Sequence, residues 1–149
     1  MHFEGKVSIQ APREKVWDFL TDPKKVSKSA PGLEKLEIVE PGRKFRATTS
    51  IGFGSVKLRF VNDVEWVELD PPNMARMKAH GTAPGSAVDA KTSMTLTDGQ
   101  DGGTDLAWTA DVDVVGTVAS LAARLMGGVT KRLTAAFFDS VRAEIEKSA

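Results

Sequence analysis

The C-terminal segment, residues 116–149, constrains the fold most, because it has the apolar periodicity of one long amphipathic helix. Its apolar residues recur at spacings of three and four, which places them on one face, and charged residues occupy the opposite face. At 1.5 Å per residue, a helix over residues 117–146 is about 43 Å long. Another part of the chain must therefore supply a wide apolar surface to cover it. The apolar stripe comprises Val118, Leu121, Ala122, Leu125, Met126, Val129, Leu133, Ala136, Phe137, Ser140, Val141 and Ile145.

The region from residue 33 to residue 115 supplies that surface, because apolar and polar residues alternate there over several strand-length runs. Odd positions face inward in residues 45–51, even positions in residues 56–60, and even positions again in residues 106–114. Glycine- and proline-rich turns separate the runs, as in Pro41-Gly42 and Pro84-Gly85. This pattern predicts an antiparallel sheet with one face on the core.

Residues 3–9 alternate as a first strand, and a short helix opens at Pro12, with a second, shorter one over residues 22–32. We therefore expect an α+β fold: a strand, two short helices, a six-stranded antiparallel sheet, and a long C-terminal helix packed across it. With 149 residues and no linker or repeat, a single domain over residues 1–149 is expected.

Composition excludes several classes of function. Twenty basic residues balance twenty acidic ones, so the chain lacks the field that draws proteins onto nucleic acid. No cysteine is present, which rules out disulfides and thiolate chemistry. The sequence has neither a secretory signal nor an apolar run of about 18 residues, and we expect a cytoplasmic protein.

Few residues are suited to catalysis, since the chain has two histidines and no tyrosine. His2 lies at the start of the chain, and strand parity places His80 in solvent beside Lys78. Neither histidine has a partnered acid at a useful spacing. Asp111 and Asp113 alternate with apolar residues and should also face solvent. No metal or nucleotide motif is present, and we predict no catalytic residue.

One polar residue shares parity with the core. Asn62 follows Val56, Leu58 and Phe60 in inward register, so it is expected either at a strand bulge, which we favour, or inside, where its amide orients a polar headgroup.

Small residues on both the sheet and the helix leave two packing alternatives open. Either the helix drops onto the sheet and the core is solid, or larger side chains hold it off and an apolar cavity remains, which needs a ligand to fill it. Gly127 and Gly128 either let the helix bend as a hinge or permit close contact with the sheet. The candidate cavity residues are Phe45, Thr49, Leu58, Phe60, Asn62, Trp66, Met77, Thr92, Met94, Trp108, Leu121, Leu125, Met126, Val129 and Phe137.

This order of elements resembles the helix-grip fold of START-like lipid-transfer proteins and polyketide cyclases. Within that superfamily the sequence is similar to the carbon monoxide dehydrogenase G-subunit family, nearly end to end. The residues that carry the resemblance are 11–23, 30–36, 52–57, 67–72, Gly81, 85–87, 103–104, Gly116, Leu121, 124–129 and 136–138.

The resemblance implies a non-catalytic accessory protein of a molybdenum hydroxylase of the carbon monoxide dehydrogenase type. A lipophilic ligand, with a quinone or isoprenoid lipid as the leading idea, would occupy the cavity, and no other cofactor is implied. Members are associated with recruiting the enzyme to the inner face of the membrane, but several carry a C-terminal tail beyond the helix. This sequence stops at Ala149, which leaves peripheral membrane contact open.

Two other functions stay open. The same cavity in a polyketide cyclase or hydrolase would need an inward acid or base, and only Asn62 and hydroxyl groups are available. An assembly factor would act through its surface and have a solid core.

Overall fold

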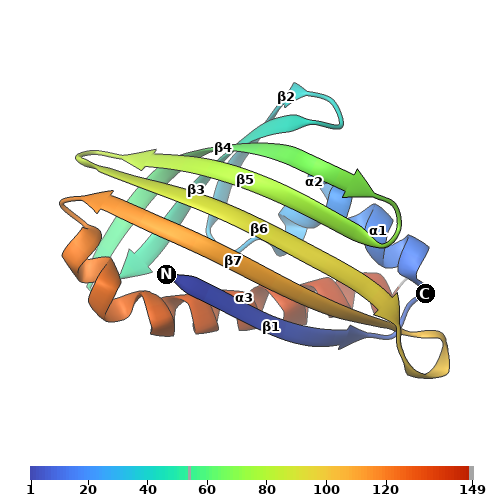
Figure 1. Ribbon diagram of the computed structural model, residues 1–149. Helices are drawn as coiled ribbons and strands as arrows, with labels where there is room; N and C mark the ends of the chain where they lie inside the picture. Colours follow the sequence, from blue (N-terminus) through green and yellow to red (C-terminus); the bar gives the residue numbers. More distant parts are fainter. Residues whose placement is uncertain (54, 148–149) are drawn as a thin grey trace.

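The computed structural model describes residues 1–53 and 55–147, in which an antiparallel sheet curves around one long helix (Figure 1). The sheet has seven strands among these residues, in the order β1-β7-β6-β5-β4-β3-β2. The elements are β1 (His2–Ile9), α1 (Arg13–Thr21), α2 (Pro23–Val26), η1 (Ser27–Ser29), β2 (Leu33–Glu40), β3 (Lys44–Phe53), β4 (Val56–Asp70), β5 (Met74–Ala83), β6 (Ser86–Asp98), η2 (Gln100–Gly102), β7 (Thr104–Gly116) and α3 (Ala119–Lys147).

The expected α+β class is present, but the prediction of a six-stranded sheet is wrong. The first strand, β1, pairs with β7 along its whole length, with Phe3 opposite Ala110 and Val7 opposite Leu106. This pairing provides hydrogen-bond partners for the backbone groups along that edge of β7, and β1 becomes the edge strand instead. The second predicted short helix is also smaller than expected, since it consists of one turn of α2 followed by the 3₁₀ turn η1.

The alternation predicted from sequence matches the sheet. In β5, Ala75, Met77 and Ala79 are buried or half-buried, whereas Arg76 and Lys78 are exposed. Consecutive strands from β2 to β7 pair as hairpins, and Gly85 turns the β5–β6 hairpin with a φ of 71°, a conformation that favours glycine. One face of the sheet is therefore the inner face and the other is solvated.

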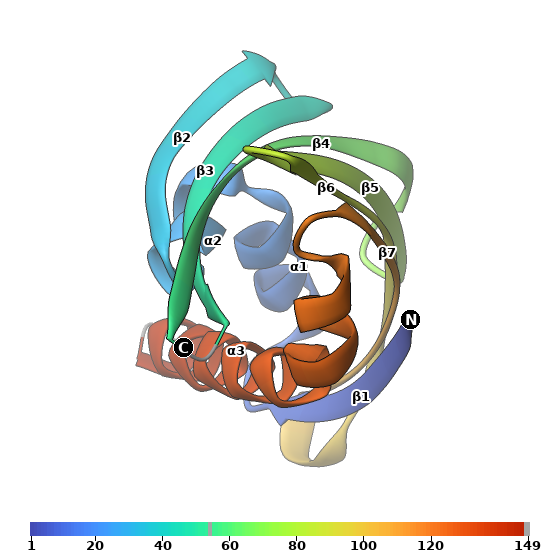
Figure 2. The same ribbon diagram turned by 90° about the vertical axis from the view of Figure 1, so that its left-hand side faces the viewer.

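Helix α3 crosses the open side of the curved sheet, as the end-on view shows (Figure 2). Its backbone approaches β1 and β7 on one side and β3 on the other, more closely than the middle strands β4, β5 and β6. On the β3 side, Arg132 Nη2 donates a hydrogen bond to the carbonyl oxygen of Gly52 at 3.1 Å. The helix bends within its N-terminal part (Figures 1 and 2) and spans the sheet as predicted. Within the residues that the structure describes, no helix is both long enough and apolar enough to span a bilayer.

The buried apolar residues form two separate clusters. An α1-end cluster joins Ile9, Val16, Leu96, Leu106, Val141 and Ile145 with the rest of α1 and the C-terminal part of α3. A hairpin-end cluster centres on Phe60 and Val129, and Ile51, Leu58, Leu121, Leu125, Met126 and Leu133 pack against it. The C-terminal and N-terminal parts of α3 are thus held by different sets of side chains, and the inner face of the sheet continues between them.

Candidate functional site

The inner face between the two clusters carries small and polar side chains rather than a packed apolar core. Ala47, Thr49, Ala79, Ala90 and Thr92 all face inward, are only half-buried, and belong to neither cluster. The middle strands that bear most of them lie away from α3. We refer to this region as the central band. Its inward-facing hydroxyls and one amide are the polar groups that a molecule between sheet and helix would meet.

Asn62 is the polar centre of the central band. Its Nδ2 donates to the carbonyl oxygen of Ala47 at 2.9 Å and to Thr49 Oγ1 at 3.0 Å. The favoured prediction of a strand bulge at this residue is wrong, because β4 stays in regular register there, with Ala47 and Gly81 as neighbours. The register shift falls between Trp66 and Glu68 instead. Asn62 therefore points inward, as the alternative prediction had it.

Gly81 is a part of this site that the sequence interpretation missed. It is buried on β5 opposite Asn62, and a Cβ at this position would collide with Asn62 Oδ1. Glycine in a strand interior often marks such a close approach, which is the signal that could have identified it. Within residues 1–53 and 55–147, no protein donor reaches Asn62 Oδ1. This oxygen is free to accept a hydrogen bond from a bound molecule.

The predicted cavity residues fall into three groups on the inner side. Four pack against the α1-end cluster, six lie in or against the hairpin-end cluster, and five lie between them. The first group is Trp66, Met94, Trp108 and Phe137; the second is Leu58, Phe60, Leu121, Leu125, Met126 and Val129; the third is Phe45, Thr49, Asn62, Met77 and Thr92. The structure thus places all of them inside, and their binding role stays a prediction.

The glycine pair of α3 does not serve close packing. Gly127 and Gly128 are exposed, and a Cβ built on either would meet nothing within 4 Å. The alternative that they permit close contact with the sheet is therefore wrong. The hinge remains a prediction.

Both histidines have an acid partner, contrary to the sequence interpretation. His80 Nδ1 lies 2.7 Å from Asp89 Oδ1, and His2 Nδ1 lies 2.7 Å from Asp111 Oδ1. Each histidine lies opposite its acid on the neighbouring strand, and the separation of the two residues in the sequence does not indicate this pairing. The hydrogen bond to Asp111 raises the pKa of His2 above its ordinary value of 6.5. Both pairs are exposed, as is Asp113, so the predicted solvent orientation is confirmed.

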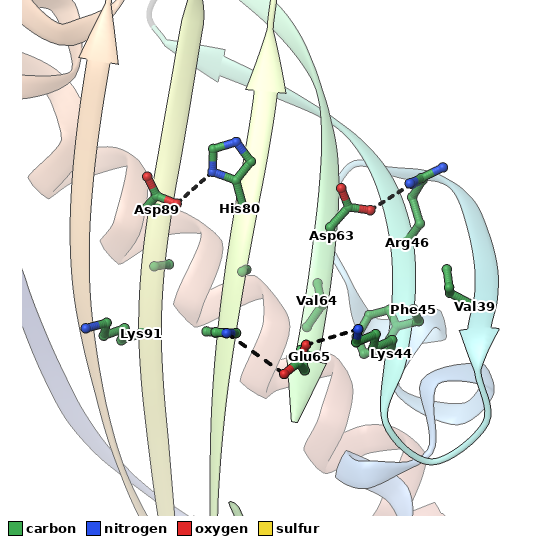
Figure 3. A pocket seen from close by; sticks show the side chains of 13 residues that line it. Val39, Lys44, Phe45, Arg46, Asp63, Val64, Glu65, His80, Asp89 and Lys91 are labelled. Carbon is green, nitrogen blue, oxygen red and sulfur yellow. Dashed lines mark hydrogen bonds and ion pairs between the residues drawn. The ribbon is translucent and has the colours of Figure 1, made fainter. Parts of the chain in front are cut away.

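His80 and Asp89 border a trough of about 470 Å³ on the outer face of the sheet (Figure 3). Several of its charges form ion pairs: Arg46 Nε lies 2.8 Å from Asp63 Oδ1, Lys44 Nζ lies 3.5 Å from Glu65 Oε2, and Lys78 Nζ lies 3.9 Å from Glu65 Oε1. Exposed pairs of this kind contribute little to stability, and the lining carries four basic and three acidic side chains, so its formal charge is small. In the described part of the chain, no group of three or more His, Asp or Glu side chains could hold a metal ion.

A second groove, of about 580 Å³, lies between β1 and α3. Phe3 and Val7 line it from β1, Trp108 from β7, and Gly127 and Phe138 from α3. The Trp108 and Phe138 rings stack with centroids 6.4 Å apart and planes at 28°. A Cβ on Gly5 would lie within 3 Å of the Trp108 ring, so the glycine leaves room for the indole against β1.

A curved antiparallel sheet that grips one long C-terminal helix, with short helices between the first two strands, defines the helix-grip, START-like class of proteins. Within this class, the chain belongs to the carbon monoxide dehydrogenase G-subunit (CoxG) family, whose model matches residues 5–146. The family's name links its members to carbon monoxide dehydrogenase. No curated protein sequence matches the chain.

Solved structures show the same fold. A conserved protein from Geobacillus kaustophilus is 31% identical with a TM-score of 0.91, over 99% of this chain and 97% of the other. The ZhuI aromatase/cyclase from Streptomyces sp. R1128 is 21% identical with a TM-score of 0.75, over 99% and 94% of the two chains. A Thermus thermophilus protein is 16% identical with a TM-score of 0.72, over 100% and 99%.

Proposed function

We propose that this protein is a carrier that binds a quinone-like or isoprenoid lipid between its sheet and α3, and that it acts as a non-catalytic accessory of a molybdenum hydroxylase. The observation that carries the proposal is the central band. Two apolar clusters hold the ends of α3, while the inner face between them bears alanine, threonine and one asparagine. A gap between these surfaces costs stability when empty and is filled well by an apolar guest.

The chemistry of the central band suits a guest with an apolar tail and a polar ring. Met77, and Met94 at the border with the α1-end cluster, are flexible apolar groups that adapt to a bent chain, and each Å² of apolar area removed from water contributes about 25 cal/mol. Asn62 Oδ1 and the hydroxyls of Thr49 and Thr92 offer hydrogen bonds to a headgroup. A quinone has this combination of parts.

The partner enzyme is inferred from family membership. The family takes its name from carbon monoxide dehydrogenase, and a carrier of an electron acceptor is useful to such an oxidoreductase. Peripheral contact with the inner face of the plasma membrane, from which a lipophilic guest would be drawn, belongs to the same proposal.

Native mass spectrometry of the purified protein, alone and after incubation with menaquinone, tests the carrier function. We expect a complex of one menaquinone per chain. Empty protein that takes up no menaquinone would contradict the proposal and favour an assembly factor that acts through its surface.

Asn62→Ala distinguishes the carrier from a cyclase that uses the same interior. In a carrier, loss of one hydrogen bond weakens menaquinone binding by about tenfold and leaves the complex detectable. In a cyclase, Asn62 is the inward group closest to acid–base chemistry, and turnover of a polyketide substrate would be abolished. Wild-type turnover of such a substrate, lost in Asn62→Ala, would overturn the carrier proposal.

A further inference from the structure

The groove between β1 and α3 lies where the edge of the sheet meets the side of the helix. β1 is an edge strand, so its side toward α3 has no neighbouring strand. The apolar residues Phe3, Val7 and Phe138 line the groove, and Lys131 and Arg142 border it on the helix. Gly127, Lys131, Ala135, Phe138 and Arg142 follow at three- and four-residue spacing, so one face of α3 forms this wall.

Helix α3 is fastened elsewhere. Glu146 accepts a hydrogen bond from the backbone N–H of Gln10 at 2.9 Å, just beyond the end of β1. On the opposite side Arg132 donates to Gly52, and Ser140 donates to Ser29 Oγ at 2.9 Å. Among the described residues, no hydrogen bond or ion pair joins residues 127–142 of α3 to residues 2–8 of β1. The seam along the groove is therefore held by side-chain packing.

The stacked rings of Trp108 and Phe138 both line this groove, and both also pack against the α1-end cluster. The absence of a side chain at Gly5 lets the indole lie close to β1. Movement of these two rings, one from β7 and one from α3, would open a path inward without breaking a strand pair.

We propose that the lipophilic guest enters and leaves through the groove between β1 and α3, and that Trp108 and Phe138 form the gate. This inference rests on the proposed carrier function, and its occupant is the same guest, a flat ring with an apolar tail. Aromatic rings stack on such a ring as it passes. The exposed Gly127 lines the N-terminal end of the α3 wall of this groove, and Gly128 follows it in the chain.

The lack of cysteine in the chain permits a direct test by site-specific blocking. Ala135→Cys places a thiol in the groove, and Ala143→Cys places one at an exposed position of α3 outside the groove. Each variant is measured before and after reaction with a bulky uncharged maleimide, with Thr134→Cys as a second groove position. The measurement is the rate at which menaquinone is taken up from liposomes and the amount bound at equilibrium.

Blocking the thiol of the Ala135→Cys variant is expected to slow uptake at least tenfold with unchanged equilibrium binding, whereas blocking the Ala143→Cys variant changes the rate less than twofold. If the blocked Ala135→Cys variant takes up menaquinone at a rate within twofold of its unmodified form, the groove is not the entrance. Reduced equilibrium binding after blocking would also overturn the entrance, because the groove would then be the binding site itself. Failure of the unmodified wild type to bind menaquinone overturns the carrier function instead, so the two failures are distinguishable.

Removal of the gate tests the role of the rings. Trp108→Leu is expected to speed menaquinone uptake several-fold, which a residue with a merely structural role would not do. An unchanged or slower rate in a folded Trp108→Leu protein would contradict the gate.

Discussion

At the scale of single residues, Asn62 and Gly81 form a matched pair on neighbouring strands. The asparagine amide is held by Ala47 and Thr49, and its Oδ1 occupies the space that a side chain at position 81 would need. The pair shows how a polar side chain is placed on an inner face. Hydrogen bonds fix the Nδ2 donor of Asn62, and the glycine leaves room for its Oδ1 acceptor.

Gly81→Ala tests this arrangement. The added methyl group forces Asn62 to move, and overpacking of this kind lowers the free energy of unfolding by about 1–3 kcal/mol. Urea denaturation measures the loss. Gly52→Ala is the matched control, since a Cβ there meets nothing within 4 Å, and its effect should stay within about 0.5 kcal/mol. Equal effects of the two variants would contradict the proposed contact.

His2 predicts a pH dependence at the edge of the sheet. Because the Asp111 hydrogen bond raises its pKa in the folded protein, protonated His2 stabilises the fold. This contribution is fully present below the unfolded pKa of about 6.5 and is lost as pH rises through the higher folded pKa. An NMR titration should show the pKa of His2 fall in Asp111→Asn. A pKa that is the same in both proteins would exclude Asp111 as the cause.

At the scale of elements, α3 has an apolar face that the sequence predicts and a glycine pair that interrupts the helix-forming residues. Buried Ala122, Val129, Val141 and Ile145 follow the helical period, whereas Ala136, predicted on the same stripe, is exposed. Gly127 and Gly128 interrupt this helix at exposed positions, where alanine would be the better helix former.

Gly127→Ala and Gly128→Ala should each raise the free energy of unfolding by about 0.5–1 kcal/mol, because alanine favours the helix and meets no neighbour. If the glycines serve as a hinge, the double variant also takes up menaquinone more slowly. Urea denaturation and the uptake rate give the two readouts. A more stable variant with unchanged uptake would exclude the hinge.

The periodicity of single elements could be predicted from the sequence, but pairing between distant elements could not. Alternation placed Met77, Thr92 and Trp108 on the inner face, because the period of two fixes which side each residue takes. Three features depend on the register between strands, which the pattern of a single strand does not contain. They are the pairing of β1 with β7, the His2–Asp111 hydrogen bond and the close approach of Gly81 to Asn62. The register shift between Trp66 and Glu68 is not marked in the sequence by a glycine or proline.

At the scale of the whole molecule, two apolar clusters hold α3 across a curved sheet, and the central band lies between them. The clusters give the fold its stability at both ends. The central band, with its small side chains and one free amide oxygen, is left for function. The groove between β1 and α3 is the entrance that we propose for this region.

Filling the central band tests the carrier function most directly. Ala90 faces inward from the middle of β6 and is half-buried, so Ala90→Leu should fit the space without loss of stability and exclude the guest. Ala143→Leu, at an exposed position of α3, is the control. The decisive measurement is the equilibrium affinity for menaquinone, for which we predict at least a tenfold loss in Ala90→Leu and none in Ala143→Leu. Binding by folded Ala90→Leu as tight as that of the wild type would contradict a guest in the central band.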